Sequence, residues 1–260
     1  MKKSNLLLII IFVTFNYGYS QEINLDTIRI TNQIKVSKKI SKDYIKNVVD
    51  SEEIIQYNYQ NKQLTSIITT SPAGDVIEKE TVKCQDNKLN EIHYEYFKYK
   101  DIEASAFTFS FEYTNDLITK LIETENGIQT EEHYTYNKLN QLKEVRIVKD
   151  KKVLETRKCK YNKKGHLVKV IYFVNDYSYS DSYKSYDTKK NSYELIFPKP
   201  YLKLINSEGN NVLEENIKGD NFTYDYEYNS DDYPVKIIEK KDNEIVNITS
   251  IEYQYRNYLK

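Results

Sequence analysis

The chain has 260 residues, of which 38 are basic and 39 acidic, so its formal charge at pH 7 is −1. A nucleic-acid surface needs a concentrated basic patch, so this balance excludes nucleic acid as a partner. Charged residues make up 30% of the chain and alternate along it, which is typical of solvated sheet faces.

The first twenty residues have the layout of a cleaved secretory signal. Lys2 and Lys3 give a positive start, Leu6–Val13 is an unbroken apolar run, and Gly18 and Ser20 are small residues at the cleavage site. The apolar run is well short of the ~20 residues of a membrane-spanning helix. We therefore expect an exported protein, in the periplasm, on the cell surface or secreted, with no membrane span after signal removal. The alternative is a buried N-terminal helix.

Residues 21–260 contain no linker rich in Pro, Gly or Ser, so we predict a single β-repeat domain. Its first part, residues 21–53, is irregular and is expected to add edge strands or a less regular cap. Residues 54–260 contain a repeated unit, an aromatic-x-aromatic pair followed by a short Asn/Asp/Lys turn and an aliphatic-rich strand. The second position of that pair recurs at residues 59, 84, 113, 136 and 161, which are 23 to 29 residues apart.

The repeated unit has the chemistry of a β-hairpin. Side chains alternate along a strand, so both rings of the aromatic pair lie on one face. Asn, Asp and Gly tolerate the positive φ of tight turns. We predict an all-β fold, an antiparallel meander of tyrosine-marked hairpin repeats with about 12 to 16 strands. We expect a twisted or two-layered sheet, because a lone flat sheet leaves its apolar face uncovered.

The unit resembles the YD repeat of the Rhs family, whose tyrosine-marked hairpins follow the pattern Y-x-Y-x-x-x-G-x-L. The best copy is Cys159–Ile171, with Tyr161, Asn162, Gly165 and Leu167 in matching places. The resemblance covers about residues 57–171 and 222–255, but most units lack the glycine. It implies hairpin strands and a binding or surface role, and it transfers no catalytic residue.

A tyrosine-rich segment interrupts the repeat after residue 172. As a strand, it places Tyr177, Tyr179, Asp181 and Tyr183 on one face. An exposed row of this kind is suited to stack on sugar rings or on an extended peptide, and we take it as the candidate ligand site. The alternative is that these rings cover the sheet or pack on a neighbouring strand. The segment Phe197–Tyr201, which contains two prolines, then breaks any ladder.

The two cysteines, Cys84 and Cys159, stand at repeat positions otherwise held by aromatic residues. Six strands at ~4.8 Å would separate them by about 29 Å in an unrolled sheet. A disulfide needs Cα atoms within ~7 Å, so we predict two buried thiols rather than a disulfide. Only a closed barrel or a folded-back sheet would bring them together.

Motifs for catalysis and metal binding are missing from the sequence. His93, His133 and His166 lack metal-ligand spacing, and no nucleophile elbow, phosphate loop or dinucleotide fingerprint occurs. We predict no catalytic residue, metal or cofactor.

The expected function is an exported non-catalytic binding or structural protein that recognises a glycan or a cell-surface protein. One alternative is a periplasmic or secreted enzyme with a site assembled from distant strands. Another is an outer-membrane barrel, which the charges on both faces of Lys143–Lys152 disfavour.

Overall fold

The computed structural model describes residues 34–46, 48–100, 103–205 and 209–255. These residues form sixteen β-strands, one 3₁₀ helix and one α-helix. The elements are β1 Ile34–Ile45, β2 Val48–Gln60, β3 Gln63–Thr70, β4 Val76–Gln85, β5 Lys88–Tyr96, β6 Ser105–Thr114, β7 Leu117–Glu125, β8 Ile128–Tyr136, β9 Leu142–Lys149, β10 Lys152–Tyr161, β11 Leu167–Val174, β12 Tyr177–Tyr186, η1 Ser192–Leu195, α2 Lys199–Leu204, β13 Val212–Ile217, β14 Asp220–Tyr228, β15 Pro234–Lys241 and β16 Glu244–Tyr255.

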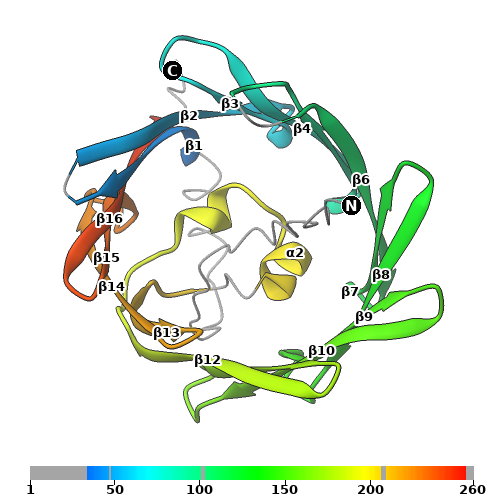
Figure 1. Cartoon of the computed structure of the whole chain (residues 1–260). Coiled ribbons are helices and arrows are strands. Elements are labelled where there is room, and N and C mark those ends of the chain that lie inside the picture. Colours follow the sequence, from blue (N-terminus) through cyan, green and yellow to red (C-terminus); the bar gives the residue numbers. More distant parts are fainter. Residues whose placement is uncertain (1–33, 47, 101–102, 206–208, 256–260) are drawn as a thin grey trace, which may run out of the picture.

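The strands close into a barrel (Figure 1). Each strand pairs antiparallel with its neighbours in the chain, and β1 pairs with β16 through a register that runs from Ile34–Tyr255 to Asp43–Asn247. The prediction of a twisted or two-layered sheet was therefore wrong. A steadily twisted and tilted meander of this length curls until its first and last strands meet, which removes both free edges.

The N-terminal part of the described chain forms regular strands. Residues 34–53 form β1 and the first half of β2, and β1 pairs with β16 where the barrel closes. Edge strands or a less regular cap were expected here, but a closed barrel has no edge. The predicted signal peptide and residues 21–33 lie outside the described residues.

The turns at one end of the barrel explain the Asn, Asp and Lys residues of the repeat. Both central residues of the turns Asn61–Lys62, Asp86–Asn87 and Asn115–Asp116 have positive φ. Two-residue turns of this kind match the twist of the flanking strands, and Asn and Asp adopt the required conformation at low cost. The repeat therefore encodes its hairpins locally.

Longer turns at the same end are held by an asparagine that follows the aromatic pair. The Oδ1 atom of Asn162 accepts hydrogen bonds from the backbone N–H groups of Lys164 and His166, at 2.9 and 3.0 Å. Asn137 and Asn229 make the same pair of bonds in their own turns. The asparagine is thus a turn cap, which accounts for the Tyr-Asn pairs of the sequence.

The tyrosines of the repeat tie neighbouring hairpins together. In six places among the described residues, a tyrosine hydroxyl donates a hydrogen bond to a carbonyl near the start of the preceding strand, at 2.5 to 2.9 Å. We call these bonds the tyrosine latches. They join Tyr113 to Leu89, Tyr136 to Ile118, Tyr161 to Leu142, Tyr186 to Leu167, Tyr226 to Val212 and Tyr253 to Pro234.

Each latch crosses a gap that strand stagger has opened. The ladder between β5 and β6, for example, ends at the pair Glu91–Ser110, so Leu89 has no ladder partner on β6. A barrel closes only if its strands are tilted and staggered, and that stagger leaves strand ends unpaired. The hydroxyl of Tyr113 reaches across and satisfies the Leu89 carbonyl.

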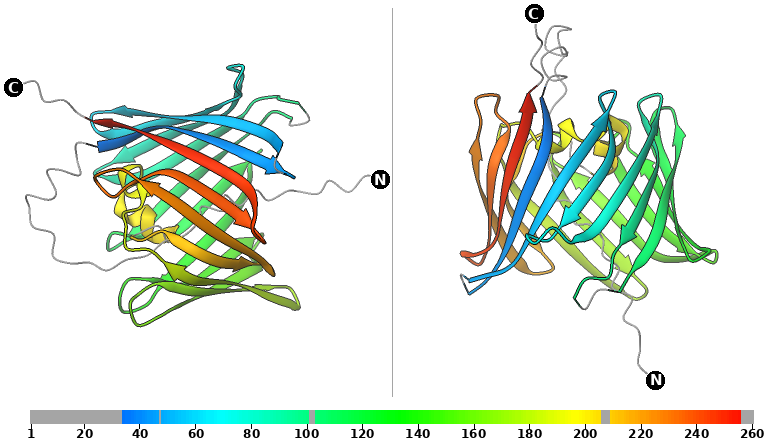
Figure 2. Two further views of the ribbon diagram at one scale, coloured as in Figure 1. Left: turned by 90° about the vertical axis from the view of Figure 1, so that its left-hand side faces the viewer. Right: turned by 90° about the horizontal axis from the view of Figure 1, so that it is seen from above.

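A long insertion in one of these turns places η1 and α2 inside one end of the barrel (Figures 1 and 2). We call residues 188–205 the plug. Ile196 and Leu204 of the plug are buried in the main apolar cluster of the barrel wall, and the Tyr201 ring meets Phe111 edge-on at 5.7 Å. Pro198, expected to break a ladder, is the N-cap of α2. Neither helix among the described residues is long and apolar enough to cross a membrane.

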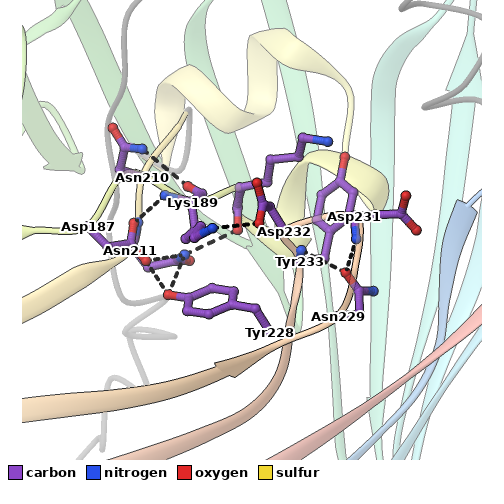
Figure 3. Close-up of polar contacts among 10 residues, drawn as sticks. Asp187, Lys189, Asn210, Asn211, Tyr228, Asn229, Asp231, Asp232 and Tyr233 are labelled. Carbon is purple, nitrogen blue, oxygen red and sulfur yellow. Dashed lines mark hydrogen bonds and ion pairs between the residues drawn. The ribbon is translucent and has the colours of Figure 1, made fainter.

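The plug is an expanded repeat turn, and its two ends are joined by a cap of the usual kind (Figure 3). Asp187 takes the place of the capping asparagine, and its Oδ1 atom accepts hydrogen bonds from the N–H groups of Lys189 and Asn211. The Tyr228 hydroxyl donates to Oδ2 of Asp187, and Lys189 forms an ion pair with Asp232 at 2.6 Å. The base of the turn therefore keeps the geometry of the other turns, although the residues between its two ends extend into one end of the lumen.

The latches yield a test of the fold. We expect Tyr136→Phe to lower the free energy of unfolding by about 1–2 kcal/mol, because the buried Ile118 carbonyl loses its donor while the ring stays in place. Urea denaturation followed by circular dichroism measures the change. Tyr177→Phe is the matched control, because Tyr177 is 80% exposed and belongs to no latch. Equal effects from the two substitutions would contradict a structural role for the hydroxyl.

Candidate ligand site in the lumen

The lumen of the barrel has two chemically different halves. At the plug end, wall residues such as Leu64, Leu89 and Ile118 form an apolar core with the plug. Away from the plug, many inward-facing positions are acidic. Glu80, for example, lies opposite Ile67 and Tyr94, which are both buried, and directly paired residues share a face. The carboxylates placed inward in this way are Asp43, Glu53, Glu78, Glu80, Glu123, Glu125, Glu132, Glu155, Asp181, Glu215 and Glu239.

Burial changes the acidity of several of these groups. It raises the pKa of Glu80 to about 8, with a further contribution from the charge of Glu78. It also raises the pKa of Glu215 to about 7, although the hydrogen bond that Glu215 accepts from Tyr224 acts in the opposite direction. A buried carboxyl group binds its proton more tightly because the charged form loses hydration. The lumen therefore carries less negative charge at neutral pH than its composition indicates.

A pair of stacked tyrosines lies on the wall formed by β10, β11 and β12. The rings of Tyr172 and Tyr179 are parallel within 4° and their centroids are 4.6 Å apart. Tyr172 is buried, but Tyr179 is 37% exposed and Tyr177 extends beyond it toward the open end. The ring of Tyr179 is supported by the parallel ring of Tyr172, and the Lys218 ammonium lies over it at 5.8 Å from its centroid. A supported aromatic ring of this kind suits the stacking of a flat apolar surface.

Polar groups flank the stacked pair. The Arg157 guanidinium lies 5.9 Å from the centre of the Tyr172 ring and forms an ion pair with Glu155. Burial lowers the pKa of Arg157, but the charges of Glu132 and Glu155 raise it by more. On the other side, Oδ1 of Asp181 accepts a hydrogen bond from the Lys218 N–H at 3.0 Å. Donors and acceptors thus lie within one patch of wall.

One of these polar groups has unused hydrogen-bonding capacity. Among the described residues, one guanidinium nitrogen of Arg157 (Nη2) is buried without a hydrogen bond of normal geometry. Asp181 instead has the Tyr172 hydroxyl beside it, and burial, then the charge of Asp181 and the hydrogen bond between the two, raise the pKa of Tyr172. Buried polar groups are nearly always paired, so a bound polar molecule or ordered water is the expected partner of the Arg157 nitrogen.

The structure places the four predicted site residues in the lumen rather than on an outer surface. Tyr177, Tyr179, Asp181 and Tyr183 do share one face of β12, as their spacing indicates, but Asp181 and Tyr183 are buried. Only Tyr177 and Tyr179 are open to a ligand, so a platform of all four residues does not exist. That the two exposed rings bind a ligand stays a prediction.

Sequence reasoning missed the neighbours of this row. Arg157 is opposite Tyr172, and Tyr172 is opposite Tyr179, so the patch is assembled by the registers of three strands. The alternation of residues in each strand predicts which side chains share a face, but it does not predict which face lies inside the barrel. The inner face is decided by closure of the barrel.

The cysteines lie on separate strands of the barrel. Cys84 is on β4 and Cys159 on β10, they form no disulfide, and both are half-buried against the main apolar cluster. Burial raises the pKa of Cys84, which favours its neutral thiol. No group of three or more metal-ligating side chains occurs within the described part of the chain.

Solved structures with a similar fold exist. A porin-like protein from Bacteroides uniformis matches with a TM-score of 0.54 and 11% identity, over 85% of this chain and 96% of that chain. This likeness shows the barrel fold alone. A porin-like protein from Bacteroides vulgatus has a TM-score of 0.41 at 11% identity over 86% of this chain and 99% of that chain, which carries no argument. A scan of protein-family models and a search of curated proteins find no match.

The raised pKa of Glu80 has a measurable consequence. The folded state holds this proton up to about pH 8, whereas the unfolded chain releases it near pH 4.5, the ordinary pKa of a glutamate side chain. The group therefore stabilises the fold below pH 4.5, and this contribution is lost as the pH rises toward 8. We expect Glu80→Gln to unfold at higher urea concentration than the parent at pH 9, with a difference that closes toward pH 4.5.

The control for this measurement is Glu95→Gln, on the outer face, where the carboxylate pairs with Lys79 and 37% of its side chain is in contact with solvent. A gap between Glu80→Gln and the parent that is the same at every pH would show that the proton of Glu80 is not responsible.

Proposed function

We propose that this chain is an exported, non-catalytic barrel that works in water and binds a saccharide in its lumen. The observation that carries the proposal is the stacked Tyr172–Tyr179 pair, with an exposed outer ring, beside Arg157 and Asp181. A sugar ring presents an apolar face for stacking and hydroxyl groups for hydrogen bonds. Tyr179 supplies the first interaction, and the guanidinium of Arg157, whose side chain is 16% exposed, supplies a hydrogen-bond donor.

The outer face supports operation in water. Oppositely charged residues lie directly across from each other on neighbouring strands, as in Lys42–Glu52, Lys79–Glu95 and Lys83–Glu91, at 2.6 to 3.3 Å. Similar pairs join β14 to β15, where Lys236 meets Glu227 and Lys240 meets Asp225. A transmembrane barrel instead needs an outward apolar band about 25 Å tall. The outer face of this wall instead carries these ion pairs, and the main apolar cluster lies inside, at the plug end.

The plug argues against an open channel. A sixteen-stranded barrel is wide enough to leave an aqueous lumen if only wall side chains occupy it. Here Ile196 and Leu204 of the plug are buried against the wall at one end. We infer that the lumen is a cup that holds a molecule rather than a passage that transports it.

The raised pKa values are the one observation that favours an enzyme instead. Glu80 and Glu215 would be protonated near neutral pH, as a general acid must be. Burial is the main cause for both groups, and Glu215 accepts a hydrogen bond from Tyr224 of the adjacent strand. Glu215 is 3% exposed and so lacks access to a substrate, and burial together with the charge of Glu78 accounts for the raised pKa of Glu80 without a catalytic role. The binding function is therefore the better supported of the two.

Calorimetric titration tests the proposal, with cello-, manno- and chito-oligosaccharides as probes. We expect one class to bind saturably and Tyr179→Ala to weaken it by about three- to tenfold, because the stacking face is lost. Ser180→Ala is the control, since Ser180 lies on the same strand and faces outward. Circular dichroism confirms that each variant is folded. Binding that is unchanged in Tyr179→Ala, or no binding to any of the three classes, would contradict the proposed site.

A further inference from the structure

A cleft lies outside the proposed saccharide site, at the plug end of β11 and β12. On its other edge β12 continues to pair with β13 as far as Tyr186, whereas the ladder between β11 and β12 ends at the pair Lys169–Ser182. The strands separate there and leave a cavity of about 510 Å³. The latch from Tyr186 to the Leu167 carbonyl, at 2.5 Å, joins the two strands across this gap.

Positive charge is concentrated around this cleft. Its lining includes Lys163, Lys164 and Lys184 together with His166, and no carboxylate is among the described residues that line it. Lys184 forms an ion pair with Glu214 at 2.6 Å, so its charge is partly neutralised. Burial, and after it the charge of Lys164, lowers the pKa of His166, which favours the neutral imidazole.

The cleft is built on a rigid frame. Asn162 accepts hydrogen bonds from the N–H groups of Lys164 and His166, so the backbone of the turn that carries the lysines is held in place. The imidazole of His166 packs on the Tyr186 ring with a centroid distance of 4.6 Å. The lysine side chains are flexible, but their attachment points are not, which lowers the entropic cost of gathering them on one anion.

We propose that this cleft binds a phosphate group. Ammonium groups act as point charges that surround a tetrahedral dianion from several sides, whereas a planar carboxylate is better matched by the fork of an arginine. The cleft offers lysines from two strand ends and no arginine. The hydroxyl of Ser185 and the amide of Asn162 add uncharged partners at its edge.

Two sources of the phosphate are compatible with this chemistry, a free phosphate ion and the phosphate of a sugar ester. Titration with inorganic phosphate, with glucose 6-phosphate and with glucose separates them, all at one ionic strength set with chloride. Binding of inorganic phosphate alone assigns the free ion. Tighter binding of glucose 6-phosphate, with none of glucose, assigns the ester. Both outcomes support a phosphate site, and saturable binding of neither phosphate would overturn it.

Substitutions locate the site. We expect Lys164→Gln to weaken phosphate binding by about tenfold, because one charge-assisted hydrogen bond is lost. Lys83→Gln is the matched control, since Lys83 is an exposed lysine on β4. Equal weakening by both substitutions would show a general charge effect and contradict the site.

Tyr179→Ala distinguishes this inference from the saccharide proposal. It should leave phosphate affinity unchanged, because the cleft contains no part of the Tyr172–Tyr179 pair. Failure of the saccharide titration alone therefore does not affect the phosphate site.

Discussion

The tyrosine latch is the interaction on which the barrel depends. Closure of sixteen strands demands tilt and stagger, and stagger leaves the start of one strand in each pair without a ladder partner. An unpaired carbonyl in a buried wall costs free energy. A tyrosine has the length to cross that gap with its hydroxyl, while its ring fills the inner face of the sheet. The latches from Tyr113 to Leu89 and from Tyr253 to Pro234 stand at equivalent places in distant repeats.

The plug shows how the same repeat is adapted to a wide lumen. Wall side chains alone cannot fill a barrel of sixteen strands, so an apolar interior needs an additional element. The chain provides it by lengthening one turn while keeping the Asp187 cap at its base. One half of the lumen becomes a packed core, and the other half keeps its carboxylates and the Tyr172–Tyr179 pair. The outer wall is left to hydrated ion pairs.

The candidate site was only partly predictable. Alternation along β12 correctly placed Tyr177, Tyr179, Asp181 and Tyr183 on one face, because a strand has a period of two whatever its surroundings. It did not reveal that this face is inside, that half of the row is buried, or that Arg157 belongs to the same patch. Those facts depend on the registers of neighbouring strands and on closure. The phosphate cleft depends on the end of a ladder, which has no linear signature.

By itself the sequence determined the hairpins, since alternating rings, positive-φ turn residues and capping asparagines such as Asn162 act over a few residues. Only the tertiary structure decided that the meander closes, because pairing of Ile34 with Tyr255 joins residues at opposite ends of the described chain. That contact reflects the accumulated twist and stagger of every intervening strand. Each strand contributes a small rotation that local patterns do not specify, and their sum decides between an open sheet and a barrel.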